Sequence, residues 1–178
     1  PRAAELGLPG DALFANAYLG ARPIVEALAD GADIVITGRV ADASLFLAPL
    51  VHEHGWAWDD WDRLAAGVTA GHLLECSGQV TGGNYSGAWW ENPDPLRVGF
   101  PIGAVDEDGS FVVSKPEGTG GMVTFDTVRE QLLYEVHDPS RYLNPDAVAD
   151  FTAVTLTDLG DDRVRVSGAR GGPPPATY

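Results

Sequence analysis

Three side chains that can do chemistry share one helical stripe near the middle of the chain. His72 and Glu75 lie one helical turn apart, and Cys76 lies one turn beyond His72. A histidine oriented by a carboxylate can act as a general base, and a cysteine beside a protonated imidazole can become a nucleophile. The alternative for His72 and Glu75 is a satisfied polar pair at the end of a core helix. For Cys76 the sequence favours a small apolar filler.

A second candidate is TGRVADAS, residues 37–44, which follows a short apolar run and precedes a helix. Ligands of open α/β sheets bind beyond the carboxyl ends of the strands, so Thr37 and Arg39 are predicted to contact a ligand. Arg39 can clamp a carboxylate or a phosphate with two hydrogen bonds. Asp42 is a candidate base, although an aspartate at such a place more commonly caps the following helix.

The third candidate is an anion site in the turn EGTGG, residues 117–121. Backbone N–H groups that precede a helix carry partial positive charge, which suits a phosphate or a carboxylate. Lys115, the only lysine of the chain, adds a point charge. We assign the four central residues of the turn to ligand binding: Gly118, Thr119, Gly120 and Gly121. The opposing interpretation is that the glycines only supply positive φ or close packing, because the spacing matches neither a P-loop nor a dinucleotide fingerprint.

Three further motifs are weaker indications of a functional site. The loop TGGNYSG, residues 81–87, places Asn84 where it can reach a ligand. His52 and His54 do not share a helix face and lack a third ligand with matching spacing, so we predict no metal site. Trp89 and Trp90 can cover an apolar ligand or a subunit interface, although core packing is the default for them.

The elements that must position these residues indicate an α/β fold. Helical spacing of apolar residues predicts a helix over residues 22–30, and DIVITG, residues 33–38, is typical of a strand buried on both faces. A longer helix begins at residue 59 or 60 and ends at residue 77 or 78. Helix, buried strand, loop and helix in this order are typical of a parallel sheet with packed helices.

The second half of the chain alternates as β-hairpins do. Residues 100–116 and 152–168 each place alternating apolar residues on both sides of an Asp- and Gly-containing turn. Between them, Thr127 and Glu130 have capping-box spacing at the start of a helix, and Asn144 is predicted to cap a short helix. We therefore predict a mixed, partly parallel sheet with packed helices, and β-hairpins in the second half.

The length and the composition are typical of one globular domain. We predict a single α/β domain over residues 1–172, as a fragment of a larger domain, and a flexible tail over residues 173–178. The net charge of −15 provides no basic footprint for nucleic acid and disfavours anionic membranes. A single cysteine excludes an internal disulfide, which fits a reducing cytoplasm. We predict a cytoplasmic protein without nucleic-acid or membrane partners. The sequence leaves open whether the protein forms a homo-oligomer.

Four stretches of the sequence together resemble one family, that of the acyclic terpene utilisation protein AtuA: residues 15–45, 72–87, 99–143 and 163–171. The resemblance covers nearly the whole chain and implies an internal part of that family's N-terminal domain. It also implies bacterial catabolism of branched terpenoids such as citronellol and geraniol, by way of acyl-CoA thioesters and a biotin-dependent carboxylation. It carries over no catalytic residues.

Two functions follow. In the first, the chain is part of a catabolic enzyme in which Arg39, Lys115 and the turn amides bind a small acidic or CoA-linked substrate. His72, Glu75 or Asp42 then moves a proton, in hydration or enolisation; no cofactor is predicted, and a CoA thioester can enter as the substrate. In the second, the chain is a noncatalytic subunit that binds an acyl-CoA or scaffolds a partner carboxylase. The first is favoured if the three candidate loops line one cleft.

Overall fold

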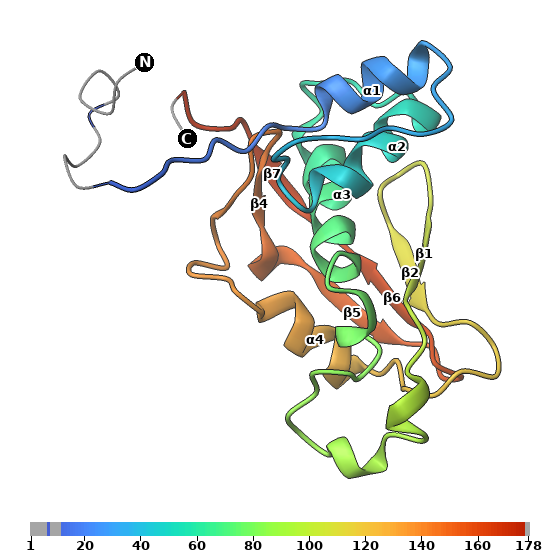
Figure 1. Cartoon of the computed structure of the whole chain (residues 1–178). Coiled ribbons are helices and arrows are strands. Elements are labelled where there is room, and N and C mark those ends of the chain that lie inside the picture. The colour runs from blue at the N-terminus through green and yellow to red at the C-terminus, as the bar shows by residue number, and fades with distance from the viewer. Residues whose placement is uncertain (1–6, 8–11, 177–178) are drawn as a thin grey trace.

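The computed structural model describes residue 7 and residues 12–176 of the chain, and it combines helices with two antiparallel sheets (Figure 1). The helices are α1 (Arg22–Ala29), α2 (Ser44–His54), α3 (Trp61–Leu74) and α4 (Phe125–Leu133). Four short 3-10 turns lie between these helices and strands: η2 (Ser77–Gln79), η3 (Trp89–Glu91) and η4 (Pro95–Arg97) after α3, and η5 (Phe151–Ala153) between two strands of the second half.

Two hairpins join to form the larger sheet, in the order β1-β2-β6-β5. Its strands are β1 (Ile102–Val105), β2 (Phe111–Ser114), β5 (Thr155–Asp158) and β6 (Val164–Ser167). The smaller sheet has the order β3-β4-β7, with β3 (Tyr142–Leu143), β4 (Val148–Asp150) and β7 (Arg170–Gly172). Phe111, Val113, Val164 and Val166 alternate with half-buried residues and turn into the core. The alternation therefore gives the two central strands, β2 and β6, one buried face each.

Helix α3 is the centre of the molecule (Figure 1), and it contacts α2, α4, β4 and β7. Asp60 caps its N-terminus by accepting a hydrogen bond from the Arg63 amide at 3.3 Å. Every residue from Leu64 to Leu73 is buried, which is typical of a helix surrounded by other elements. Gly71 allows α2 to approach closely, because a Cβ atom there would overlap the Ala43 carbonyl oxygen.

The mixed α/β class and the hairpins of the second half are confirmed, but the partly parallel sheet is not. Both sheets are antiparallel, and parallel pairing among the described residues is limited to isolated bridges, Leu19 with Val40 and Val98 with Gly120. The predicted strand over residues 33–38 is wrong: Ile34 and Ile36 are 82% and 93% exposed. A β-branched run specifies a strand only where other strands pair with it, and no described strand lies alongside.

Two predicted helix starts are also corrected. Helix α4 begins three residues earlier than predicted, because Thr124 accepts a hydrogen bond from the Thr127 amide and the Thr127 hydroxyl accepts one from the Thr124 amide. The capping box therefore lies at Thr124 and Thr127, not at Thr127 and Glu130. Asn144 caps no helix, since the residues after it form β4. Residues 177 and 178 of the predicted tail lie outside the described part.

Candidate functional site

The carboxyl group of Glu75 lies just after α3, where it accepts a hydrogen bond from the Cys76 thiol, with Sγ 2.9 Å from Oε1. Burial raises the pKa of Glu75, and the negative charges of Asp42 and Glu135 raise it further, while the thiol hydrogen bond opposes them. A carboxyl with a raised pKa holds its proton to higher pH than a free glutamate does. This is the property that a glutamate needs for general acid–base catalysis.

The imidazole of His72 is buried, with 2% of the residue exposed, against the rings of Tyr142 and Phe151, which also stack on each other. The ring centroids lie 5.1 Å and 5.3 Å from that of His72. Burial lowers the pKa of His72, and hydrogen bonding with the backbone of Leu132 and Gln131 opposes this only in part. The neutral imidazole therefore predominates at pH 7, and its Nε2 atom has no hydrogen-bond partner among the described residues.

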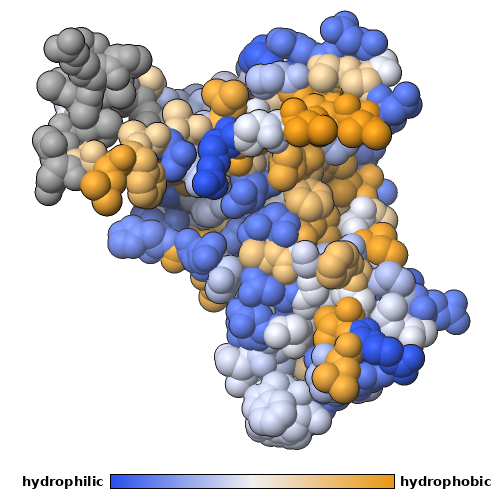
Figure 2. All heavy atoms as spheres, in the orientation of Figure 1, coloured by the Kyte–Doolittle hydropathy of each residue, from blue (hydrophilic) through white to orange (hydrophobic). Residues whose placement is uncertain are grey.

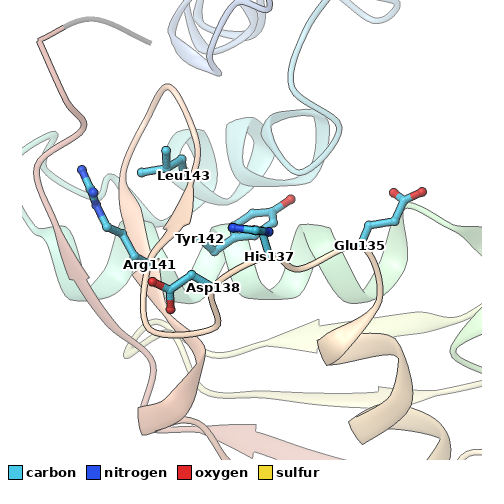
Figure 3. A pocket seen from close by; sticks show the side chains of 6 residues that line it. All are labelled: Glu135, His137, Asp138, Arg141, Tyr142 and Leu143. Carbon is cyan, nitrogen blue, oxygen red and sulfur yellow. The ribbon is translucent and has the colours of Figure 1, made fainter.

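A hollow of about 330 Å³ opens at the segment that follows α4 (Figure 3), and one of its lining residues, Tyr142, packs against His72. Its volume is at the lower end of the range of small-molecule sites. The lining residues combine charged, aromatic and aliphatic side chains: Glu135, His137, Asp138, Arg141, Tyr142 and Leu143. In the view of Figure 3, Arg141 and Leu143 lie at one end and Glu135 at the other, with Tyr142 and His137 between them.

Glu135 connects the hollow to the other two groups. Its carboxylate is close enough to raise the pKa values of both His72 and Glu75, and its side chain lines the hollow. Its backbone has a φ of +57°, a conformation that is uncommon outside glycine and that clusters at functional sites. Glu135 is therefore the residue through which a bound molecule would come near Glu75.

The opposite end of the hollow offers a cation. The Asp138 carboxylate is held by its own turn, where it accepts hydrogen bonds from the amide and the hydroxyl of Ser140 at 3.0 Å and 2.7 Å. These bonds, followed by the charges of His137 and Arg141, lower the pKa of Asp138. Arg141 makes no ion pair with a described residue, so its guanidinium can pair with a carboxylate on a ligand.

Asp42 and Asn84, two of the predicted site residues, lie near this region. Helix α2 begins at Ser44 after Ala43 without a side-chain cap, so Asp42 does not have the capping role that is common for an aspartate there. Asp42 instead acts electrostatically on Glu75. Asn84 lines a narrow crevice against α4, together with Gln79, Tyr85, Thr127, Glu130, Gln131 and Tyr134. The loop that follows α3 therefore closes over α4.

Thr37 and Arg39 are exposed and have other neighbours. The Arg39 guanidinium lies 5.8 Å from the centroid of the Tyr18 ring, and Nη1 is 3.5 Å from the Tyr18 hydroxyl. No contact of Thr37 or Arg39 with the hollow is present among the described residues. Their predicted contact with a ligand stays a prediction.

The Lys115–Gly121 turn uses its polar groups internally. Lys115 Nζ is 3.1 Å from an Asp162 carboxylate oxygen and donates to the Thr119 carbonyl at 2.9 Å. The amides of Thr119, Gly120 and Gly121 donate to carbonyl groups of Pro116, Arg97 and Pro93. Gly118 and Gly121 have φ values of +75° and +86°, which the turn requires of glycine. Anion binding at this turn stays a prediction, and it would have to displace these partners.

The structure thus places the three predicted catalytic residues in one region and the predicted anion-binding residues in others. The charge of Asp42 raises the pKa of Glu75, and the charge of Glu135 raises the pKa values of both His72 and Glu75. Lys115 and Arg39 have separate partners, Asp162 and Tyr18. Within the described residues, no group of three His, Cys, Asp or Glu side chains is placed to hold a metal ion.

Sequence reasoning missed a buried aspartate that joins three segments. Both oxygens of Asp146, 8% exposed, accept hydrogen bonds from the Ala21 amide at 2.8 Å and 2.9 Å. The Ser44 hydroxyl donates to Asp146 at 2.6 Å, and Asn144 Oδ1 accepts from the Asp146 amide at 2.9 Å. The carboxylate therefore faces the N-termini of α1 and α2, where a negative charge is stabilising.

Glu135, Arg141 and Tyr142 were missed as well. The sequence QLLYEVHDPSRYL contains a usable signal, because charged and aromatic residues gather immediately after a helix. The positive φ of Glu135 and the ring contact of Tyr142 with His72 could not be predicted from this sequence.

Comparison with known proteins gives one match. The model of the family described as acyclic terpene utilisation family protein AtuA matches residues 4–178. No curated protein and no solved structure matches the chain. Across the described residues, every helix is too short or too polar to cross a membrane.

Proposed function

Because the chain belongs to the acyclic terpene utilisation family AtuA, we propose that it binds an acidic or CoA-linked intermediate of branched terpenoid breakdown and moves a proton on it. The intermediate lies in the hollow between Glu135 and Leu143, and Glu75 is the group that exchanges the proton. The observation that carries the proposal is the partly buried Glu75 carboxyl, whose pKa is raised in part by Glu135; Glu135 lines a hollow in which Arg141 makes no ion pair with a described residue.

The two ends of the hollow suit the two ends of such a molecule. At one end, Arg141 binds an anionic group of the ligand, because a guanidinium binds anionic oxygens with two parallel hydrogen bonds. Tyr142 and Leu143 provide apolar surface for a branched hydrocarbon chain. Glu135 lies at the end opposite Arg141, toward Glu75 (Figure 3).

The chemistry is proton transfer at a carbon beside the carbonyl, as in enolisation or hydration. The ionised Glu75 takes a proton from that carbon and returns it, and its raised pKa brings its affinity for the proton closer to what the reaction needs. Asp42 and Glu135 assist by raising this pKa, and Arg141 anchors the ligand at the other end of the hollow. His72, neutral and packed against Tyr142 at a tilt, holds that ring at the wall of the hollow.

Isotope exchange tests the proposal directly. The protein is incubated in D₂O with citronellic acid or with its CoA thioester, and deuterium in the recovered ligand is measured by mass spectrometry. We expect deuterium beside the carbonyl with one of the two ligands, and at least a hundredfold slower incorporation with Glu75→Gln, because general acid–base catalysis contributes about 10²–10⁴-fold. Glu53→Gln is the matched control, since Glu53 is an exposed glutamate of α2.

Binding separates the substrate site from the chemistry. Arg141→Gln is expected to weaken binding in calorimetry without altering the exchange rate at saturating ligand by more than a few fold. Exchange that persists in Glu75→Gln, or binding that is unchanged in Arg141→Gln, would contradict the proposal.

A second function is favoured by a different observation. Trp89, Trp90, Leu96 and Phe100 are 62%, 68%, 95% and 69% exposed, and exposed aromatic side chains are common where proteins associate. A noncatalytic subunit that docks on a partner carboxylase would use such a surface. Ligand binding without any isotope exchange, together with loss of the carboxylase contact in Trp90→Ala, would favour this second function.

A further inference from the structure

Residues 33–38 cross the molecule as an uncovered strand-like segment after α1 (Figure 1). Val35 packs against the core, whereas its neighbours Ile34 and Ile36 are 82% and 93% exposed. An extended segment places neighbouring side chains on opposite sides, so Ile34 and Ile36 lie on the open side of this one. Figure 2 shows an apolar patch on this face, where the segment passes below α1.

The backbone of the segment is also open. Among the described residues, the N–H and C=O groups of residues 33–38 form no backbone hydrogen bond. Its two ends are nevertheless fixed. The Ala32 amide donates to the Ala27 carbonyl at 3.1 Å, and Leu19 bonds to Arg39 and Ala41 at 3.0 Å and 2.9 Å. A segment held at both ends with unpaired groups between them is a ready template for another strand.

We infer that this segment pairs with the same segment of a second copy of the chain, as an antiparallel strand pair centred on Ile36. The charges at the two ends of the segment favour a second copy as the partner and determine the register of the pair. Asp33 precedes the apolar stretch and Arg39 follows it, so antiparallel pairing about Ile36 brings Asp33 of each copy beside Arg39 of the other. Both residues are exposed, and within the described part of the chain the Arg39 side chain lies against that of Tyr18.

The same pairing covers the apolar surface. Ile34 and Ile36 of both copies meet across the two-fold axis, as an isologous interface requires of a self-complementary patch. A patch of large exposed aliphatic side chains in a soluble chain marks an interaction site.

The experiment measures the mass of the full chain by light scattering and analytical ultracentrifugation. At about 0.15 M salt the repulsion between two copies of charge −15 is screened beyond about 8 Å. Wild type is expected at twice the 18.8 kDa of one chain. Ile36→Asp is expected at the mass of one chain, because two like charges then meet at the axis. Leu96→Asp is the control, since Leu96 is 95% exposed on η4, and it is expected to stay dimeric.

Charge reversal tests the register. Asp33→Arg and Arg39→Asp each place like charges side by side, so each is expected to be monomeric, and the double variant is expected to dimerise again. A monomeric wild type, a dimer that survives Ile36→Asp, or a double variant that stays monomeric would overturn the inference. Circular dichroism of each variant distinguishes loss of pairing from loss of the fold.

Discussion

Replacing Asp146 by alanine should destabilise the fold, because this carboxylate is the acceptor for two buried donors on two helices. The Ala21 amide and the Ser44 hydroxyl both donate to it at less than 3 Å. Each buried donor that loses its partner costs about 1–3 kcal/mol. Asn144 Oδ1, 3.5 Å from the Ser44 hydroxyl, can recover part of the loss. Burial raises the pKa of Asp146, which shows that the carboxylate is costly to bury. Its removal therefore offsets a further part of the lost stability. We therefore expect a net cost of about 2–4 kcal/mol.

Urea denaturation followed by circular dichroism measures this cost as a change in the free energy of unfolding. The matched control is Asp158→Ala, because the exposed Asp158 accepts one hydrogen bond from the Gly160 amide at 2.8 Å. That variant is expected to lose no more than about 1 kcal/mol. Equal effects of the two variants, or a cost of Asp146→Ala below about 1 kcal/mol, would refute the reasoning that Asp146 joins the starts of α1 and α2.

Two further variants test the centre of the fold. Burial lowers the pKa of His72 below 6.5, so the unfolded chain takes up a proton that the folded chain does not. The free energy of unfolding should therefore fall as the pH drops below about 6.5. In urea denaturation, His72→Gln should show a smaller fall between pH 7 and pH 5. An unchanged pH dependence in this variant would show that His72 is not the group that takes up the proton. In Gly71→Ala the new Cβ overlaps the Ala43 backbone, whereas in Gly67→Ala it meets the flexible tip of Leu47. Overpacking costs about 1–3 kcal/mol, so thermal denaturation should find Gly71→Ala the less stable of the two.

The parts of the fold that the sequence predicts correctly depend on local information. The hairpins of β1 with β2 and β5 with β6 follow from alternating apolar residues around Gly- and Asp-containing turns. Helix α3 follows from its apolar stripe and from the capping aspartate at position 60. The segment over residues 33–38 fails for the opposite reason, because whether an apolar run is buried depends on distant strands that the run itself does not specify.

The same distinction between local and nonlocal information applies to the candidate site. The helical spacing of His72 and Glu75 predicts that they share a face, and both act electrostatically with Glu135. The bond between Asp146 and Ala21 spans 125 positions, so no local pattern indicates it. The partners of Lys115 are equally nonlocal, because Asp162 lies on the turn between β5 and β6.

The most direct test of the proposed site is the titration of the Glu75 carboxyl, followed by ¹³C NMR with assignment from Glu75→Gln. We predict a pKa above 4.5, the ordinary value for glutamate, because burial and the charges of Asp42 and Glu135 disfavour ionisation. The pKa should move down toward 4.5 in Glu135→Gln. A Glu75 pKa at or below 4.5, or one that does not respond to Glu135→Gln, would contradict the claim that this carboxyl holds the proton beside the hollow.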